Sequence, residues 1–240
     1  MIELKELEAP TLKELFVQEM EALILSGKLK IGDKLPSERL LAEGMKVSRS
    51  VVSAGLVDLK NKGFLRILPR SGTYVEDYRR VGKLETFVSL LKYNGGRFRR
   101  EDALSLLRLR CSLKEMATED FLKVATPKTL GELEAVFKRL RDAKLLSEQT
   151  QAAIAFDHEL AFFSGNTMLP LIFSSFAIPY EVLMDEYFQM KGQHARYVEL
   201  IDYYMNCLKQ KDLPCAVASI RRGSQEAEDA ILSDAWPLLP

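Results

Sequence analysis

Apolar and polar residues alternate at helical spacing through three segments near the start of the chain. Residues 11–25 form the first segment, where Thr11 followed by Glu14 is a capping-box pattern. Residues 37–44 and 48–61 form the second and third, each opening on a serine suited to an N-cap and each ending close to a glycine. The pattern predicts three helices, with a short turn between the second and the third.

The third predicted helix has an unusual polar side. Its apolar stripe consists of Val52, Leu56 and Leu59. The opposite arc carries Arg49, Ser50, Ser53 and Lys60. Such a face suits the major groove of DNA, because arginine bonds guanine O6 and N7 in bidentate fashion and short serine side chains let the backbone approach closely.

Two short apolar stretches after the third helix predict a β-hairpin. "FLRIL" and "TYV" flank "PRSG", a proline-led loop in which Gly72 tolerates a positive φ. Three helices followed by a two-stranded ribbon constitute a winged helix-turn-helix. Arg70 and Ser71 are then expected at the tip of the wing, where they would reach the neighbouring minor groove or the DNA backbone.

The chain beyond residue 80 shows helical periodicity throughout, without strand signals. Helices are predicted at residues 84–93, 103–124, 130–146, 150–163, 168–188, 196–208 and 216–232. The expected fold class is mainly α. A winged helix-turn-helix domain is expected at residues 1–79, and an all-helical bundle of about six to seven helices at residues 80–240.

Charge is distributed unevenly although the chain as a whole is neutral. Lys and Arg number 34, as do Asp and Glu, but residues 28–80 hold 12 Lys or Arg against 6 Asp or Glu. A basic segment in a neutral protein is typical of a module that binds a polyanion. Three cysteines without CxxC spacing predict thiols in a reducing cytoplasm, and the longest apolar run is too short for a bilayer.

The stretch "GKLKIGDKLPSERLLAEGMKVSRSVVSAGLVDLKNKGFLRILPRSGTYV" resembles the DNA-binding domain of GntR-type bacterial transcription regulators. The shared order is G-x-LPSER-LA, VSR, Leu-x-x-x-G-hydrophobic and SGT-hydrophobic-V. By this resemblance Arg39 would contact DNA backbone or bases, Arg49 would read a base, and Gly72 would let the wing tip enter the minor groove. Two further side chains would hold phosphates, those of Ser48 and Ser50. Many members carry an arginine where this chain has Ser53, which implies a different operator or one contact fewer.

An all-helical partner domain points, within this resemblance, to the FadR-like subfamily, whose C-terminal bundle binds a small effector and forms the dimer. "FDHELAFFSGNTML" resembles one helix end of that bundle. Many such relatives hold a divalent metal with one Asp and three His. This chain has only two histidines, and alignment on "SGN" puts Ala153 and Asp157 at the first two ligand positions. We therefore expect no metal of that type and no cofactor, although a site built from Asp157 and other oxygens stays an alternative.

An effector can also bind without a metal. Arg110 falls where relatives tend to carry an arginine on the first long helix of the bundle, and an arginine facing a cavity suits a carboxylate or phosphate. The expected effector site comprises Arg110, Asp157 and Asn166. A surface ion pair is the alternative role of Arg110.

These features predict a cytoplasmic, sequence-specific DNA-binding regulator, preferably a repressor. It would bind a pseudo-palindromic double-stranded operator as a homodimer and respond to an organic acid or metabolite. Two alternatives stay open: a metal-independent acyl-CoA sensor of lipid metabolism, and a helical adaptor whose winged helix binds protein. An enzyme is not expected, because the chain has no Gly-rich phosphate loop, no GxSxG and no HExxH.

Overall fold

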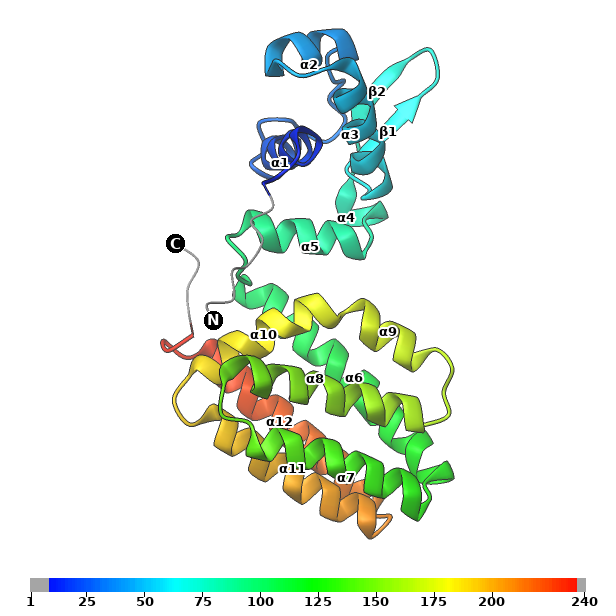
Figure 1. Ribbon diagram of the computed structural model, residues 1–240, viewed down its shortest axis with the longest axis vertical. Coiled ribbons are helices and arrows are strands. Elements are labelled where there is room, and N and C mark those ends of the chain that lie inside the picture. The colour runs from blue at the N-terminus through cyan, green and yellow to red at the C-terminus, as the bar shows by residue number, and fades with distance from the viewer. Residues whose placement is uncertain (1–8, 237–240) are drawn as a thin grey trace, which may run out of the picture. The chain divides into compact units, whose positions relative to one another are not determined.

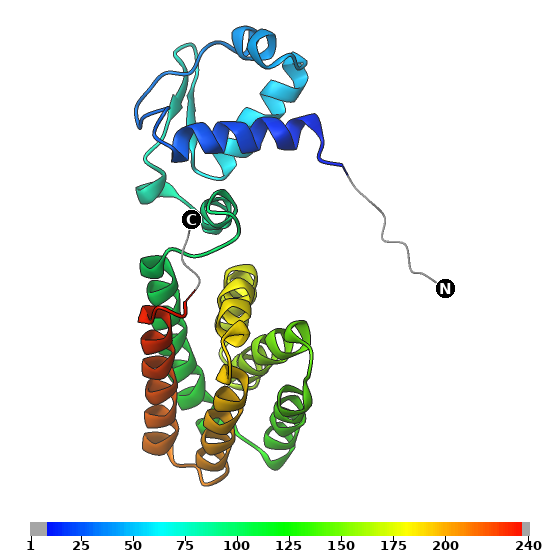
Figure 2. The same ribbon diagram turned by 90° about the vertical axis from the view of Figure 1, so that its left-hand side faces the viewer.

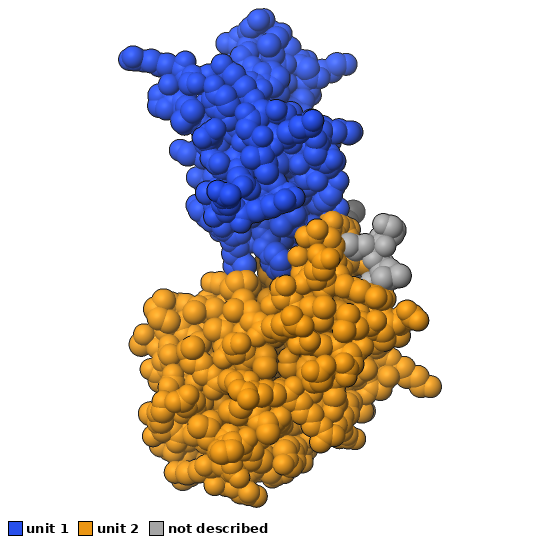
Figure 3. Space-filling model, turned by 180° about the vertical axis from the view of Figure 1, so that it is seen from behind, with its two compact units in different colours: residues 1–93 blue, residues 94–240 orange. Residues whose placement is uncertain are grey.

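The computed structural model describes residues 9–236. The chain divides into two compact units, residues 1–93 and residues 94–240, which Figure 3 shows in different colours. The predicted fold class is confirmed: the N-terminal unit holds the winged helix and the C-terminal unit is helical. None of the helices formed by the described residues is long and apolar enough to cross a membrane.

Three helices open the N-terminal unit, at the positions expected from the sequence (Figure 1). They are α1 (Leu12–Leu25), α2 (Glu38–Met45) and α3 (Arg49–Asn61). The Thr11 hydroxyl accepts the Glu14 N–H at 3.2 Å, while the Glu14 carboxylate accepts the Thr11 N–H at 2.8 Å, which confirms the capping box. The second helix does not stop at Gly44. It continues to Met45 and ends there, because the next residue, Lys46, adopts a left-handed conformation.

The wing consists of β1 (Leu65–Leu68) and β2 (Gly72–Val75), which pair antiparallel with Leu65 opposite Val75 and Leu68 opposite Gly72. Gly72 belongs to β2 and does not lie in the loop. Gly72 has the positive φ that the sequence suggested, 123°, and Arg70 in the turn also has a positive φ, 61°. The loop of the wing is short, because the three residues 69–71 between the strands reverse the chain.

Two helices follow the wing, α4 (Tyr78–Val81) and α5 (Leu84–Tyr93). The sequence did not predict α4. Helix α5 belongs to the N-terminal unit, where the buried Glu21 carboxylate on α1 accepts hydrogen bonds from Ser89 Oγ of α5 at 2.9 Å and from Lys62 Nζ at 2.7 Å. The structure therefore divides the chain after Tyr93, later than the expected boundary at residue 79.

Helices α6 to α12 make up the C-terminal unit. Their bounds are α6 (Arg100–Val124), α7 (Pro127–Asp142), α8 (Leu146–Phe163), α9 (Leu169–Ser175), α10 (Ala177–Gln189), α11 (Gln193–Lys209) and α12 (Leu213–Leu232). In Figures 1 and 2, α12 runs beside α6 and next to α11, and α7 lies against α8 and α11. A single helix over residues 168–188 was the wrong prediction. The chain leaves helical geometry at Phe176 (φ −93°, ψ 11°), and the next helix starts anew from there.

The expectation of free thiols is wrong for two of the three cysteines, which lie on α11 and α12 on either side of the turn between these helices. Cys207 and Cys215 form a disulfide, with their Cα atoms 5.6 Å apart. The antiparallel hairpin of two helices brings them together, a relation that their spacing of eight residues does not reveal. Cys111 is a free thiol, and burial raises its pKa.

Candidate functional site

The outer side of α3 is open to solvent. Its exposed positions include the four expected ones, Arg49, Ser50, Ser53 and Lys60, and also Ala54, Val57 and Asn61. Its buried positions include Val52, Leu56 and Leu59, each at most 2 % exposed. Among the described residues, neither an ion pair nor a hydrogen bond holds the Arg49 side chain, so the guanidinium at the start of the helix is available to a partner.

The N-terminal end of α3 is built for close contact with an anion. Ser48 is the N-cap, and its hydroxyl accepts the Val51 N–H at 3.3 Å. The Ser48 and Ser50 hydroxyls lie 2.8 Å apart. The free N–H groups of a first turn and the helix dipole both favour a phosphate at this place. Arg39, in α2, is also exposed and forms a 2.9 Å ion pair with Glu43, a contact that costs little to exchange for another anion.

The predicted wing residues lie together at the end of the hairpin. Arg70 and Ser71 are exposed at the turn, and the Ser71 hydroxyl lies 2.8 Å from the Tyr74 hydroxyl. Gly72 is partly buried, and a Cβ atom at this position would lie 2.8 Å from Cε of Lys34. The structure thus gives Gly72 a packing reason that the sequence did not suggest: it leaves room for a lysine side chain.

A cavity of about 90 Å³ lies inside the C-terminal unit, between α6, α8, α10, α11 and α12. Its walls are mainly apolar and aromatic. The polar and ionisable side chains on its lining are Arg110, Cys111, Lys114, Asp157, Tyr180, Tyr187, Tyr197, Tyr204, Ser219, Ser224 and Trp236. A mainly apolar cavity with a few convergent polar groups is the usual character of a small-molecule site.

Two buried cations meet one buried carboxylate on this lining. Arg110 Nη2 lies 2.7 Å from Asp157 Oδ2, and Lys114 Nζ lies 2.8 Å from Asp157 Oδ1. The guanidinium also packs on the Tyr180 ring, with Cζ 3.1 Å from the ring centroid. Burial opposes ionisation of Asp157, but the charges and hydrogen bonds of Lys114 and Arg110 outweigh it and hold the pKa of Asp157 below its usual value.

Lys114 is the residue of this ionic cluster that the sequence analysis missed. It lies one helical turn after Arg110 on α6, so the spacing of four residues was the available signal. Its ammonium group lies 5.2 Å from the Phe156 ring centroid and 5.3 Å from that of Tyr204, and its side chain is 12 % exposed. Arg110 is therefore part of a buried ionic cluster and not of a surface ion pair.

Two buried N–H groups on the cavity lining, Arg110 Nε and Trp236 Nε1, lack acceptors within residues 9–236, and the buried Tyr197 hydroxyl there also lacks a partner. Trp236 is 1 % exposed and is the only tryptophan of the chain. Buried N–H groups are normally satisfied, so both donors fit a ligand that brings oxygen acceptors.

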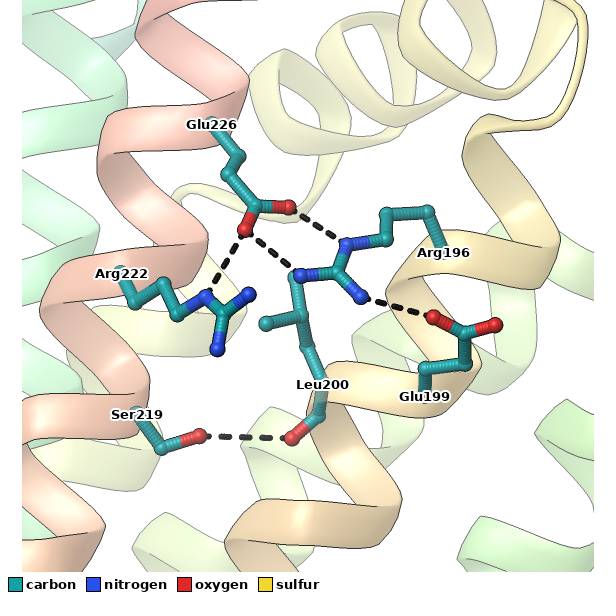
Figure 4. A network of polar contacts seen from close by, with 6 residues as sticks. All are labelled: Arg196, Glu199, Leu200, Ser219, Arg222 and Glu226. Atoms are coloured by element: carbon teal, nitrogen blue, oxygen red, sulfur yellow. Dashed lines mark hydrogen bonds and ion pairs between the residues drawn. The ribbon is translucent and has the colours of Figure 1, made fainter.

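Polar contacts join α11 to α12, two of the helices that line the cavity, as Figure 4 shows. Arg196 of α11 forms two 2.7 Å hydrogen bonds to the Glu226 carboxylate of α12, and Arg222 adds a third at 3.0 Å. These hydrogen bonds, led by that of Arg196, lower the pKa of Glu226 to about 2. Beside them, Ser219 Oγ donates to the Leu200 carbonyl at 3.3 Å, and both of these residues line the cavity.

The structure does not bring Asn166 to this cavity. Its side-chain carbonyl accepts the Met168 and Leu169 N–H groups at the start of α9, and its amide donates to Asp120 at 3.1 Å. The two histidines also have partners elsewhere: Nε2 of His158 lies 3.1 Å from Ser174 Oγ, and Nε2 of His194 lies 3.0 Å from the Leu140 carbonyl oxygen. Within the described part of the chain, His, Cys, Asp and Glu do not gather in groups of three or more that could hold a metal.

Comparison with known proteins gives the fold and the family. Residues 12–75 match the profile of the bacterial regulatory proteins of the gntR family. The chain is 30 % identical to the HTH-type transcriptional repressor YtrA of Bacillus subtilis over 92 residues, which are 38 % of this chain and 71 % of YtrA. The chain belongs to the GntR family.

Other GntR-family relatives extend the match beyond the winged helix. The HTH-type transcriptional regulator Mce2R of Mycobacterium tuberculosis is 29 % identical over 165 residues, 66 % of this chain and 65 % of Mce2R. The chain thus spans just under two thirds of that relative. One solved structure, described as Lar, which controls the expression of the Listeria monocytogenes agr system and mediates virulence, superposes with a TM-score of 0.62 at 16 % identity, over 93 % of this chain and 98 % of that one. These GntR relatives are named as transcriptional regulators and not as enzymes.

Proposed function

We propose that this GntR-family protein is a sequence-specific DNA-binding repressor that acts as a homodimer on a pseudo-palindromic operator. The observation that supports it most directly is the solvent-exposed start of α3, where Arg49 stands free beside Ser50 and Ser53. An adaptor that binds protein through its winged helix would not need an unpaired arginine at a helix N-terminus. In this proposal residues 1–79 supply the DNA contacts and residues 80–240 the effector and dimerisation sites, while α5 of the second range packs on the N-terminal unit.

The mechanism follows from the groups on that face. Arg49 forms a bidentate pair with a guanine in the major groove, while Ser48, Ser50 and Ser53 lie against the backbone and neighbouring bases. Arg39 exchanges its contact with Glu43 for a phosphate. Arg70, Ser71 and Gly72 bring the wing to the adjacent groove. Two copies of α3 in successive major grooves then read two half-sites.

Fluorescence anisotropy with duplex DNA selected from a random library by the wild-type protein tests this proposal. Arg49→Ala should lower affinity for the selected duplex by about 1–3 kcal/mol and relax the preference at one base position. Affinity should fall roughly a thousandfold or more between about 50 and 200 mM salt if six or more phosphates are engaged. An equal loss on selected and scrambled DNA would contradict base reading, and a wild-type protein that selects no duplex would refute the function.

We further infer that the protein is a FadR-like regulator whose operator affinity responds to a small anion in the cavity of the C-terminal unit. The charge balance there supports an anion: among residues 9–236, Arg110 and Lys114 face a single buried carboxylate, that of Asp157. The tyrosines on the lining stay neutral, because burial raises the pKa of Tyr180 and Tyr204. One negative charge on a ligand would neutralise the site.

Cavity size separates a small acid from the acyl-CoA alternative. At about 90 Å³ the cavity is well below the roughly 300–1,000 Å³ of sites for drug-sized ligands. Arg110 also lines a hollow of about 400 Å³ beside α8 and α9, but Glu159 and Glu181 line it too and disfavour an anion. A short carboxylic acid fits both the volume and the charge.

The single tryptophan in the cavity wall reports on binding. Propionate and butyrate should change Trp236 fluorescence and raise the melting temperature, whereas neutral butyramide should do neither. Lys114→Met should abolish the response to butyrate. A response to octanoyl-CoA but not to the short acids would favour the acyl-CoA alternative, and a response to none of them would leave DNA binding as the function without this effector class. Ligand-linked changes in operator affinity are typically worth about 1–3 kcal/mol.

A further inference from the structure

Two cations from separate elements lie against one tyrosine ring at the base of the wing. Lys34 Nζ is 5.9 Å from the ring centroid of Tyr74, and Arg66 Cζ is 5.6 Å from it. Arg66 is the β1 residue directly opposite Tyr74 in the hairpin, and Lys34, in the segment before α2, forms a β-bridge with Tyr74 from its other side. Three strand-like segments therefore place these two cations beside the same side chain.

The fold holds Lys34 in this place. The Leu35 N–H donates to the Thr73 carbonyl at 2.8 Å, and the Val75 N–H donates to the Asp33 carbonyl at 2.9 Å, so the segment before α2 pairs with the edge of β2 through an isolated β-bridge. Gly72 leaves the space through which the Lys34 side chain passes. Such an arrangement orients the lysine through the backbone, whereas an ordinary surface lysine is free to move.

The cluster carries positive charge that its own neighbours do not neutralise. Lys34 has no ion-pair partner within the described residues, and Arg66 has a single long contact, 3.8 Å to Glu76. Both side chains are exposed. The face of an aromatic ring offsets only part of the repulsion between two cations held beside it. An external anion would offset the rest.

We propose that Lys34 and Arg66 bind backbone phosphates of the DNA next to the wing, and that Tyr74 is the residue that positions them. This inference rests on the proposed DNA binding and adds two contacts beyond the recognition helix and the wing tip. Phosphate is the expected partner, because lysine offers a point charge and arginine a planar fork, and neither lies on the helix that reads base edges. The Tyr74 hydroxyl, at 2.8 Å from Ser71 Oγ, ties this cluster to the wing tip.

Salt-dependent DNA binding by single variants of the full chain tests the proposal. Lys34→Ala and Arg66→Ala should each weaken binding about 3–10-fold, equally on the selected and on a scrambled duplex, and each should reduce the salt slope by about one. Lys34→Arg, which keeps the positive charge, should have the salt slope of the wild type. Tyr74→Ala, which keeps both charges, should lose part of the affinity without changing the net charge of the protein.

Lys92→Ala is the matched control, because it removes one exposed positive charge from α5 of the same unit. Its affinity and salt slope should equal those of the wild type. If Lys34→Ala and Arg66→Ala behave like Lys92→Ala while Arg49→Ala still loses affinity, the phosphate contacts are refuted and the DNA-binding function stands. If the wild type binds no duplex, both fail together.

Discussion

Gly55 of α3 faces the Phe16 ring of α1 so closely that a Cβ atom at residue 55 would overlap the ring. This close approach holds α3 against α1, since Phe16 is 3 % exposed and belongs to the core that also contains Val52, Leu56 and Leu59. Gly55→Ala should therefore destabilise the protein by about 1–3 kcal/mol through overpacking. Urea unfolding followed by circular dichroism measures the change.

Gly44→Ala in α2 is the control for that experiment, because a Cβ atom there meets nothing within 4 Å. It should stabilise the protein by about 0.5–1 kcal/mol, the ordinary gain of alanine over glycine in a helix. Equal effects of the two substitutions would show that the contact between residues 55 and 16 carries no packing cost.

Removing the carboxylate of Asp157 should have a much larger effect than removing an exposed one. Asp157→Asn leaves Arg110 and Lys114 buried without their counter-ion, so the free energy of unfolding at neutral pH should fall by about 3–5 kcal/mol. Glu119→Gln, in an exposed pair with Lys123, should change it by less than about 0.5 kcal/mol.

The pH dependence of the Asp157 effect has a definite sign. Its pKa in the folded protein is lowered, so the stabilisation is present above the unfolded value near 3.8 and is lost as pH falls through the lower folded value. The difference between wild type and Asp157→Asn should therefore shrink only in strong acid. A difference that stays constant down to the lowest accessible pH would show that the carboxylate charge is not its cause.

Glu186, on α10, should show the opposite sign. Burial raises its pKa to about 7, against the opposing effects of the Phe98 backbone and the Arg97 charge. Because the folded protein holds the proton up to a higher pH than the unfolded chain, stability should fall as pH rises from about 4.5 to about 7. Glu186→Gln should match the wild type below pH 4.5 and exceed it by about 3 kcal/mol above pH 7. Thermal melts at several pH values decide this, and a wild type that is as stable as Glu186→Gln at pH 8 would contradict it.

Helix α5 should be required for a stable N-terminal unit. A fragment of residues 9–93 keeps the hydrogen bond from Ser89 to Glu21, whereas a fragment of residues 9–79 leaves Glu21 paired with Lys62 alone and uncovers the side of α1 that packs on α5. The shorter fragment should unfold at a lower urea concentration. Equal midpoints would support the boundary at residue 79.

Local sequence by itself determined the winged helix. The caps at Thr11, Ser37 and Ser48, the apolar stripe of α3 and the proline-led hairpin loop are all interactions between near neighbours in the chain, which is why helical period and cap residues located these elements. The same locality pointed to the exposed face of Arg49. In the C-terminal unit the helical period of apolar residues located the helices. It missed the break at Phe176, because the apolar pattern continues there although the backbone leaves helical geometry.

Only the tertiary structure decided which distant residues meet. Helix packing places Lys114 in an ion pair with Asp157, which lies 43 residues further along the chain. Cys207 meets Cys215 because α11 and α12 fold back on each other. Lys34 reaches Tyr74 only through pairing along the edge of β2. These contacts join separate helices and strands, so no pattern within one segment predicts them. The free energy of a charged side chain depends on its burial and on the charges that the fold places beside it, and only the tertiary structure sets these.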